Sequence, residues 1–260
     1  MERTEYSTDL SDKQWEIIAP LLIISSGSKA GRPLKLELRE IINAILYLIH
    51  TGCQWRELPH DFPLWNSVYY HFSKYKKNGT WERIHREIHS GLREESGKKT
   101  EPSAAIIDSQ SVKASQMVKT KGFDGNKKVK GKKYHIVVDT IGFPLAVKVH
   151  DANLSDVKQA FAIMNTLFLC FATIKIIWAD AAYRGELSTY LLLSFLCKVE
   201  IAPTLKTKGF QVVPKRWIVE RTFGWFQWDR RLMIVYERYD STSESMIYIA
   251  SIGKMLRRYK

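Results

Sequence analysis

The sequence predicts an α/β fold, in which a mixed sheet with flanking helices follows a small all-helical domain. Apolar residues recur at helical spacing through residues 1–97, and short apolar strands alternate with helices from residue 104 onward. The 260-residue chain is long enough to bury a sizeable core, and its 12% aromatic content argues against disorder. We therefore expect two structured parts, at 1–97 and 104–260, joined by a polar linker at 98–103.

Four helices are expected in the first part. Ser11 and Gln14 form a capping-box pattern at the start of the first helix. The second helix is predicted over Leu38–Ile49, where apolar residues hold i, i+3, i+4 spacing. The third is expected over Leu64–Lys77, and the fourth begins at Thr80. This pattern predicts a small bundle of the helix-turn-helix-like kind.

The second part shows a hairpin followed by alternating strands and helices, which indicates a mixed sheet covered by helices. The expected strands are Ala104–Asp108, Tyr134–Asp139, Phe143–His150, Ile174–Asp180 and Val199–Pro203. The expected helices are Asp156–Cys170, Gly185–Leu196, one from Pro214 and a last one capped by Ser241 with Glu244.

The charge is distributed unevenly between the two parts. Residues 1–97 carry 13 basic and 13 acidic residues, whereas residues 98–260 carry 27 basic and 14 acidic ones. The whole net charge of +13 therefore lies in the second part. A strongly basic domain indicates a polyanionic partner, of which nucleic acid is the most common.

Two predicted strands of the basic part end in an aspartate, at Asp108 and Asp180. If these strands are parallel neighbours, about 4.8 Å apart, both carboxylates emerge at the same edge of the sheet. Active sites of open α/β sheets lie at the carboxyl ends of strands. An aspartate at this position also serves as a turn former or helix N-cap, so the pair favours function more than either residue alone does.

Glu220 is the third candidate, on a predicted helix whose same face is partly apolar. Burying its carboxylate needs a partner, which is either Arg216 one turn earlier or a metal ion. Clustered carboxylates suit magnesium, with manganese as a substitute. Two such ions can activate an attacking oxygen and stabilise the leaving oxygen of a phosphodiester.

A lysine-rich segment leaves the Asp108 strand and is expected to contact phosphates. Its lysines are Lys119, Lys121, Lys127, Lys128, Lys130, Lys132 and Lys133. Arg216, Arg221 and Arg230 extend this basic track, although some arginines after Glu220 are expected to pair with Asp229 or Glu237. In the first part, the Leu64–Lys77 helix is the expected DNA reader, with Lys74, Lys76 and Lys77 near phosphates.

The remaining acids and histidines are interpreted as structural. Asp139 ends a strand that runs antiparallel to the Asp108 strand, so it lies at the opposite edge of the sheet. Asp151 and Asp156 are expected to support the fold. Of the histidines, His85 and His89 are expected on a solvated helix face, and His135 and His150 in the core or at an edge.

The motifs around the three acids resemble those of insertion-sequence transposases of the IS5 type. The resemblance extends through the helical part and covers nearly the whole chain in order. The strings that carry it are IIDSQSVK at Asp108, GKKYHIVVDT from Gly131, ADAAYRG at Asp180, RWIVERTFGW at Glu220, GCQWRELP from Gly52 and FPLWNSVY from Phe62.

The resemblance implies a ribonuclease H-like catalytic fold with a DDE triad at Asp108, Asp180 and Glu220, separated by 72 and 40 residues. It also implies two divalent metal ions per active site and cut-and-paste or related transposition of an insertion sequence. The expected partner is double-stranded DNA, as terminal inverted repeats and as target. Joining two DNA ends predicts a homo-oligomer on DNA.

Three alternatives remain open at this point. The first is a transposase-derived DNA-binding protein without catalysis. The second is a metal-dependent nuclease without strand transfer, and the third is an RNA-binding scaffold. The intact triad argues against the first, and the lack of an aromatic-studded sheet motif argues against the last. The most apolar stretch, 160–179, is interrupted by polar residues, so we expect a cytoplasmic, nucleoid-associated protein without a membrane partner.

Overall fold

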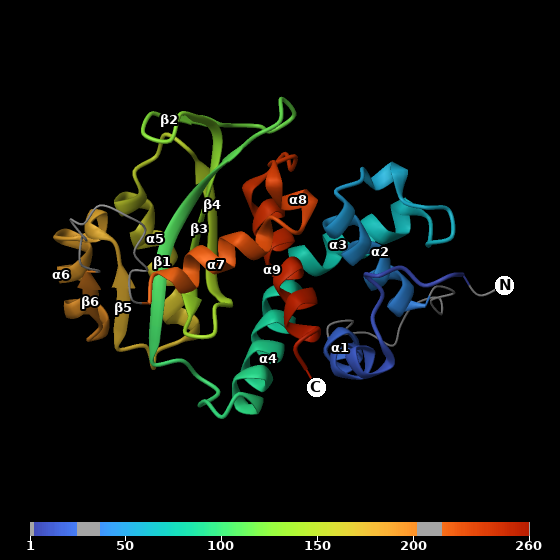
Figure 1. Ribbon diagram of the computed structural model, residues 1–260, viewed down its shortest axis with the longest axis horizontal. Helices are drawn as coiled ribbons and strands as arrows, with labels where there is room; N and C mark the ends of the chain where they lie inside the picture. The colour runs from blue at the N-terminus through green and yellow to red at the C-terminus, as the bar shows by residue number, and fades with distance from the viewer. Residues whose placement is uncertain (1–2, 25–36, 202–214, 260) are drawn as a thin grey trace.

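The computed structural model describes residues 3–24, 37–201 and 215–259, in two regions that meet along the long helix α9 (Asp240–Leu256; Figure 1). The N-terminal helices lie on one side of α9, and the sheet lies on the other. This arrangement confirms the predicted order of a helical region followed by a mixed sheet with flanking helices.

The helical region contains the four expected helices and a short 3-10 turn. They are α1 (Asp12–Ile24), α2 (Leu38–Thr51), η1 (Trp55–Glu57), α3 (Trp65–Lys77) and α4 (Thr80–Glu95). The capping box is confirmed, because the Ser11 amide donates to Gln14 Oε1 at 3.1 Å and the Gln14 amide donates to Ser11 Oγ at 3.3 Å. Gly52 ends α2 with a φ of 75°, a conformation that glycine adopts without a Cβ penalty.

The sheet of the second region is mixed. Its strands are β1 (Ala104–Lys113), β2 (Gly122–Asp124), β3 (Val129–Asp139), β4 (Pro144–Asp151), β5 (Ile176–Ala179) and β6 (Lys198–Ile201). The order is β2-β3-β1-β5-β6, and β4 also pairs with β3. Strand β1 is antiparallel to β3 but parallel to β5, which is parallel to β6. The two central strands β1 and β5 are therefore parallel neighbours, as the sequence argument required.

Helices cover both faces of this sheet. The remaining helices are α5 (Asp156–Cys170), η2 (Ala181–Tyr183), α6 (Glu186–Phe195), α7 (Trp217–Phe226), α8 (Arg230–Met233) and α9. Helix α7 crosses in front of β1 and β3 in Figure 1, whereas α5 packs on β3 and β4 from the other face. The predicted strand end at Pro203 and helix start at Pro214 lie outside the described residues.

Strand β1 is longer than predicted, so Asp108 lies in the middle of a strand and not at its end. The ladder with β3 continues through Asp108↔Ile136 to Lys113↔Gly131. Residues 109–111 are Ser-Gln-Ser, which show no apolar pattern, so the sequence does not predict that β1 continues past Asp108. The strand persists there because β3 supplies backbone hydrogen-bond partners, which satisfy the polar main chain regardless of side-chain type.

The predicted cap of the last helix is also wrong. Helix α9 begins at Asp240 with Tyr239 as its N-cap residue. Glu244 does not close a capping box on Ser241; its Oε1 accepts a hydrogen bond from the Val149 amide at 3.0 Å and lies 3.3 Å from Lys148 Nζ. The glutamate therefore ties α9 to strand β4.

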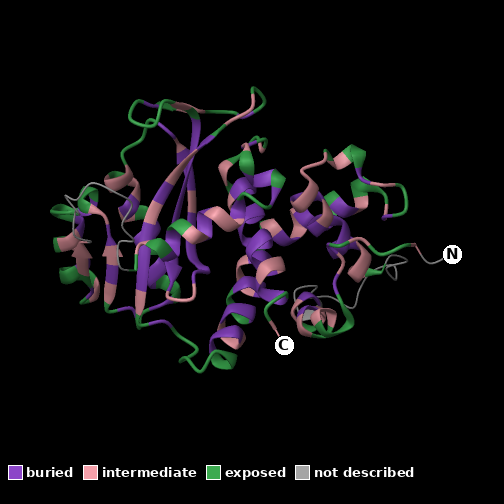
Figure 2. Ribbon diagram, in the orientation of Figure 1, coloured by how far each residue is buried: buried purple, intermediate pink, exposed green. Residues whose placement is uncertain are grey.

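The two faces of the sheet belong to different apolar cores. Ile106 and Val138 point to the core that includes α7, α9 and the N-terminal helices, whereas Ala105 and Ile107 point to the core under α5 and α6. In Figure 2 strands β3 and β4 and most of α9 are buried. One core thus runs without interruption from the helical region to the sheet.

Asp139, at the end of β3, lies at a buried junction between the two regions. Its Oδ1 accepts hydrogen bonds from the Ile141, Gly142 and Phe143 amides at 3.0, 3.0 and 3.2 Å. Its Oδ2 pairs with Arg93 and lies 3.2 Å from His89 Nε2, both on α4. Burial raises the pKa of Asp139, but His89, Arg93 and the Phe143 amide outweigh burial and hold this pKa below its usual value.

This junction corrects one expectation and confirms another. His89 and His85 are both buried, not on a solvated face, and His85 Nε2 lies 3.0 Å from Ser251 Oγ on α9. Asp139 lies at the sheet edge opposite to the extended half of β1, since it pairs in register with Ala105. Its structural interpretation is therefore confirmed.

Candidate active site

The alternation of side chains along two parallel strands brings Asp108 and Asp180 to one face of the sheet. Ile106 of β1 pairs with Trp178 of β5. Asp108 lies two residues further along β1, and Asp180 lies two residues after Trp178, just past the end of β5, with extended backbone. Side chains two residues apart point to the same face of a strand. Both carboxylates therefore share the face of Ile106, and helix α7 covers that face. The prediction of a shared edge holds, although Asp108 is not a strand end.

The Asp108 side chain is mostly buried and only partly compensated. Its Oδ1 accepts a hydrogen bond from the Ser109 amide at 2.7 Å, and Arg216 Nη2 lies 3.4 Å from its Oδ2. Burial raises the pKa of Asp108, and the nearby Asp180 carboxylate raises it further, against the Ser109 amide, Arg216 and Lys127. The net direction is upward, so this carboxylate has less positive charge around it than its burial requires.

Asp180 lies immediately after β5, at the N-cap of the 3-10 turn η2. Its Oδ1 accepts a hydrogen bond from the Ala182 amide at 2.9 Å. This is the capping role that a lone aspartate at a strand end predicts. The cap uses one carboxylate oxygen, and no hydrogen bond to the other is found among the described residues.

Glu220 projects from the first turn of α7, and its side chain is 54% exposed. The Arg216 guanidinium lies between it and Asp108: Nη2 is 3.6 Å from Glu220 Oε1 and 3.4 Å from Asp108 Oδ2. A single cation therefore contacts two of the three predicted acids. Arg216 was expected to contact DNA, and in this structure it pairs with carboxylates instead.

The three acids are neighbours, but they are not closed around a common point. Among the described residues, the one trio of potential ligands whose atoms lie within 4.8 Å of one another is His135, His150 and Asp156. Like charges repel, so three carboxylates without a metal ion are expected to stand apart.

The donor set nevertheless fits a divalent cation. Asp108 lies near Asp180 and shares Arg216 with Glu220, so carboxylate charge is concentrated around a single arginine here. Carboxylate oxygens are the ligands that magnesium prefers.

The exposed part of the lysine-rich segment leads towards Asp108. Lys127 Nζ donates to the Ser109 carbonyl at 3.2 Å, and its charge acts on the Asp108 carboxyl. Lys121 Nζ is held by the Ser115 carbonyl at 3.0 Å. The lysines of this segment that are exposed to solvent are Lys119, Lys127, Lys128 and Lys130.

Lys132 and Lys133 do not belong to this exposed set, which corrects the sequence expectation. Lys132 Nζ lies 2.6 Å from both Asp151 and Asp240, and its side chain is 1% exposed. Lys133 Nζ lies 2.9 Å from Asp156 Oδ1. Both residues fall within β3, which begins at Val129 and turns them inward. The structural interpretation of Asp151 and Asp156 is confirmed by the same ion pairs.

The arginines predicted to contact DNA differ in whether their side chains are exposed or already held by other residues of the protein. Arg221 is stacked between Trp217 and Trp225 and donates to the Ile141 carbonyl at 2.9 Å, while Arg230 is exposed. As expected for one arginine after Glu220, Arg231 pairs with Glu237 at 2.7 Å.

On α3, Lys77 is exposed and Lys74 is half-buried, whereas Lys76 Nζ contacts Thr242 Oγ1 at 2.9 Å. The outer face of this helix carries exposed residues at helical spacing, namely Asn66, Tyr69, Tyr70 and Lys77. This face remains available to a partner.

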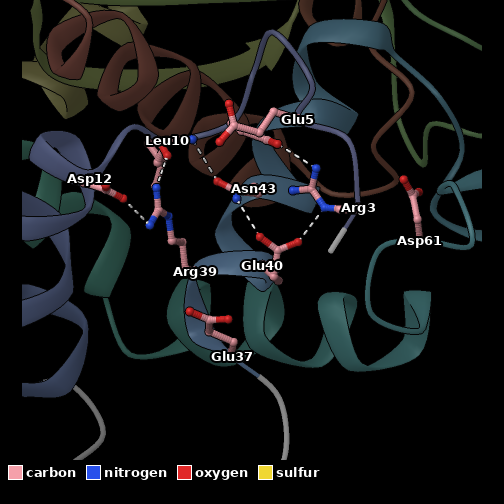
Figure 3. A pocket seen from close by; sticks show the side chains of 10 residues that line it. Arg3, Glu5, Leu10, Asp12, Glu37, Arg39, Glu40, Asn43 and Asp61 are labelled. Carbon is pink, nitrogen blue, oxygen red and sulfur yellow. Dashed lines mark hydrogen bonds and ion pairs between the residues drawn. The ribbon is translucent and has the colours of Figure 1, made fainter. Parts of the chain in front are cut away.

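A cavity of about 500 Å³ in the helical region has the wrong charge for a phosphate (Figure 3). Its acids are Glu5, Asp9, Asp12, Glu37, Glu40 and Asp61. Its two arginines are already paired, Arg3 with Asp9 and Glu40 and Arg39 with Asp12, each at 2.6 Å. DNA contact by this region is therefore expected on other surfaces, such as the outer face of α3.

Tyr183 is a site residue that the sequence argument missed. It ends η2, three residues after Asp180, and its hydroxyl lies 3.0 Å from His135 Nε2. The only sequence signal was its position in the Asp180 motif. The predicted burial of His135 and His150 is confirmed. No helix within the described ranges is long and apolar enough to cross a bilayer.

Comparison with known proteins assigns both halves of the chain. Residues 10–85 match a family described as a putative transposase of the IS4/5 family, and residues 99–251 match the transposase DDE domain. A putative transposase for insertion sequence element IS402 from Burkholderia cepacia is 31% identical over 115 residues, 42% of this chain and 54% of that protein. An uncharacterized 16.2 kDa protein of the same element is 28% identical over 109 residues, 40% of this chain and 73% of that protein. The chain thus spans about half the length of the first of these relatives.

Proposed function

Because this chain belongs to the transposase DDE domain family, we propose that it is a DNA transposase that cleaves and joins DNA through Asp108, Asp180 and Glu220. The observation that carries the proposal is that Asp108 lies near both other acids, because the Asp180 charge acts on its carboxyl and Arg216 contacts both Asp108 and Glu220. The three acids come from β1, the end of β5 and α7, and Arg216 bridges two of them. The N-cap role of Asp180 does not explain why Asp108 and Glu220 share one arginine.

The three side chains would hold two Mg²⁺ ions, or Mn²⁺ in their place. Bound ions of this kind activate an attacking oxygen and stabilise the leaving oxygen of an in-line displacement. Asp108 and Asp180 lie on strand-anchored backbone, so they supply a rigid half of the site. Glu220 is exposed on α7 and supplies the half that faces the substrate. Attack by water corresponds to cleavage, and attack by a DNA 3′-hydroxyl corresponds to strand transfer.

The charge of the surroundings supports double-stranded DNA as the substrate. Lys127 lies beside Asp108, and Lys128 and Lys130 continue the exposed basic surface. Such contacts give affinity and register without sequence choice. Sequence choice at the terminal inverted repeats is assigned to the outer face of α3. Joining two ends requires at least two copies of the chain on DNA.

The test uses purified protein with duplexes taken from the DNA on either side of the gene, together with a plasmid target and Mg²⁺. The wild type is expected to nick the duplex ends and to join them to the plasmid. Asp108→Asn, Asp180→Asn and Glu220→Gln are each expected to reduce both products by about a thousandfold or more. Glu186→Gln, an exposed carboxylate on α6, is the matched control and should leave both products unchanged.

The outcomes separate the alternatives. Nicked ends without joined plasmid indicate a nuclease that lacks strand transfer. Binding of the ends without any nick, under Mg²⁺ and under Mn²⁺, indicates a DNA-binding protein that has lost catalysis. Cleavage that survives Glu220→Gln contradicts the assignment of the triad.

A further inference from the structure

A chain of hydrogen-bonding side chains lies on the face of the sheet opposite to α7. Tyr183 Oη is 3.0 Å from His135 Nε2, and His135 Nδ1 is 3.4 Å from His150 Nε2. His150 Nδ1 lies 3.1 Å from the Asp151 carbonyl oxygen. All three side chains belong to residues that are no more than 4% exposed. The chain runs from strand β4 through β3 to the turn that follows Asp180.

The Asp151 carbonyl oxygen, at one end of this series of side chains, determines which atom donates in each hydrogen bond. A carbonyl oxygen only accepts, so His150 Nδ1 carries a proton and donates it to Asp151. A neutral His150 then accepts at Nε2, which requires a proton on His135 Nδ1. A neutral His135 in turn accepts at Nε2, so the Tyr183 hydroxyl donates. The hydroxyl oxygen is left free to accept from the other side.

The surroundings keep both imidazoles neutral. Burial lowers the pKa of His135 to about 3, with His150 and Lys133 acting in the same direction against Asp156. Burial also lowers the pKa of His150. Burial raises the pKa of Tyr183 well above its usual value, and Asp108, Asp156 and Asp180 add to this, against a hydrogen bond from the Ser109 side chain. The side chains of Tyr183, His135 and His150 are therefore uncharged at neutral pH, which agrees with the hydrogen-bond directions derived above.

A lysine ammonium already occupies the position next to this trio of potential metal ligands. Asp156 completes the compact trio with His135 and His150, but its Oδ1 already lies 2.9 Å from Lys133 Nζ. The ammonium also donates to the Leu154 carbonyl at 3.2 Å, so it is held in place. A bound cation would have to displace this buried lysine.

Tyr183 is connected to both aspartates of the candidate active site. Its amide donates to the Asp180 carbonyl at 3.3 Å, and this turn is the one that Asp180 caps. Its hydroxyl faces Ser109, whose amide donates to Asp108 Oδ1 at 2.7 Å. Tyr183 thus contacts Asp180 through its backbone and faces Ser109, the residue that hydrogen-bonds Asp108, through its side chain.

We propose that Tyr183 is a positioning residue that fixes Asp108 and Asp180 relative to each other. The His135–His150 pair fixes the orientation of the tyrosine hydroxyl, because His135 Nε2 accepts a hydrogen bond from it. This inference rests on the proposed function, because it assigns Tyr183 to the metal-binding pair of the triad. Outer partners that orient metal ligands commonly change metal affinity by about tenfold or more when they are removed.

The first test is independent of any metal. Long-range ¹H–¹⁵N spectra of the wild type, labelled with ¹⁵N-histidine and free of metal, report which ring nitrogen carries the proton. Both His135 and His150 are expected as the neutral Nδ1–H form at pH 7. Tyr183→Phe is expected to shift the His135 Nε2 resonance, because this nitrogen loses its donor. An Nε2–H form of His135, or a doubly protonated ring, would overturn the proposed chain.

The second test measures Mn²⁺ binding in solution by the loss of its free electron paramagnetic resonance signal. Tyr183→Phe is expected to weaken Mn²⁺ binding about tenfold relative to the wild type. Tyr190→Phe is the matched control: it removes another hydroxyl, which bonds Asn165 at 2.6 Å on the helical surface, and should leave Mn²⁺ affinity unchanged. Equal affinities of wild type and Tyr183→Phe would overturn the positioning role. A wild type that binds no Mn²⁺ would overturn the proposed function itself, and with it the role of Tyr183 in metal binding.

Discussion

Asp108 and Asp139 are both buried aspartates on neighbouring strands, yet their surroundings shift their pKa values in opposite directions. Asp139 accepts three amide hydrogen bonds and contacts Arg93 and His89, and its pKa is lowered. Asp108 accepts one amide and has Arg216 at 3.4 Å, and its pKa is raised. A carboxylate whose charge is fully compensated holds the fold together, whereas one left short of positive charge is available to bind a cation.

The comparison predicts the largest effect for removing the charge of Asp139. Asp139→Asn is expected to lower the free energy of unfolding by about 3–5 kcal/mol, because it leaves Arg93 buried without its counter-ion. Chemical denaturation at pH 7 measures the loss. Asp12→Asn, which breaks an ion pair with an 87% exposed aspartate, is the control and is expected to cost no more than about 1 kcal/mol. Equal losses would remove the distinction between the two kinds of carboxylate.

The contribution of Asp139 also has a predicted pH dependence. Its pKa is lower in the folded state, so its stabilising effect is complete above its unfolded pKa of about 4 and is lost as the pH falls further. The difference in unfolding free energy between wild type and Asp139→Asn should be constant from pH 7 to about pH 5 and shrink below that. Unfolding curves between pH 3 and 7 measure it. A difference that grows on acidification would contradict the assigned direction.

Lysines, like the aspartates, should fall into a buried group that stabilises the fold and an exposed group that is available to bind a ligand. Lys132→Met is expected to cost about 1–3 kcal/mol of stability, because two aspartates lose their shared partner. Lys130→Met should leave stability unchanged and lower the slope of log DNA affinity against log salt by about one. Denaturation and salt-dependent DNA binding, measured on both variants, provide the comparison. A reduced salt slope in a folded Lys132→Met protein would show that burial does not remove a lysine from the DNA surface.

A smaller effect than that of Asp139→Asn is expected for the stability of Asp108→Asn, and its sign is opposite. Since the pKa of Asp108 is raised in the folded state, its ionised form opposes folding, and the substitution should stabilise by about 0.5–2 kcal/mol at pH 7. The gain should fade on acidification, as the wild-type carboxyl takes up its proton. Thermal unfolding in metal-free buffer detects it, and a clear destabilisation at pH 7 would place Asp108 with the structural acids.

The sequence was sufficient to predict the strands that precede Asp108 and Asp180, but not the full length of the strand that carries Asp108. Apolar runs before both residues predicted central strands, and the register shows the parallel pairing on which the prediction of a shared sheet edge depended. The extension of β1 to Lys113 was not predictable, because polar residues gave no period and the partner strand decides the pairing. For the same reason the sequence predicts surface positions for Lys132 and Lys133, whereas the register of β3 turns them inward towards Asp151 and Asp156.

The histidines show a second limit of sequence reasoning. His85 and His89 lie one turn apart on a mixed polar and apolar helix, which is typical of a solvated face. Their burial depends on α9 and on Asp139, which are far away in sequence. A buried polar residue becomes recognisable only when its partner is known.

The central claim is that Asp108, Asp180 and Glu220 bind shared divalent ions, and crystals grown with Mn²⁺ test it most directly through anomalous scattering. We expect two manganese peaks bounded by these three carboxylates, with Arg216 moved away from Asp108 and Glu220. Saturating Mn²⁺ with no peak among the three acids, and with Arg216 still in contact with both, would contradict it.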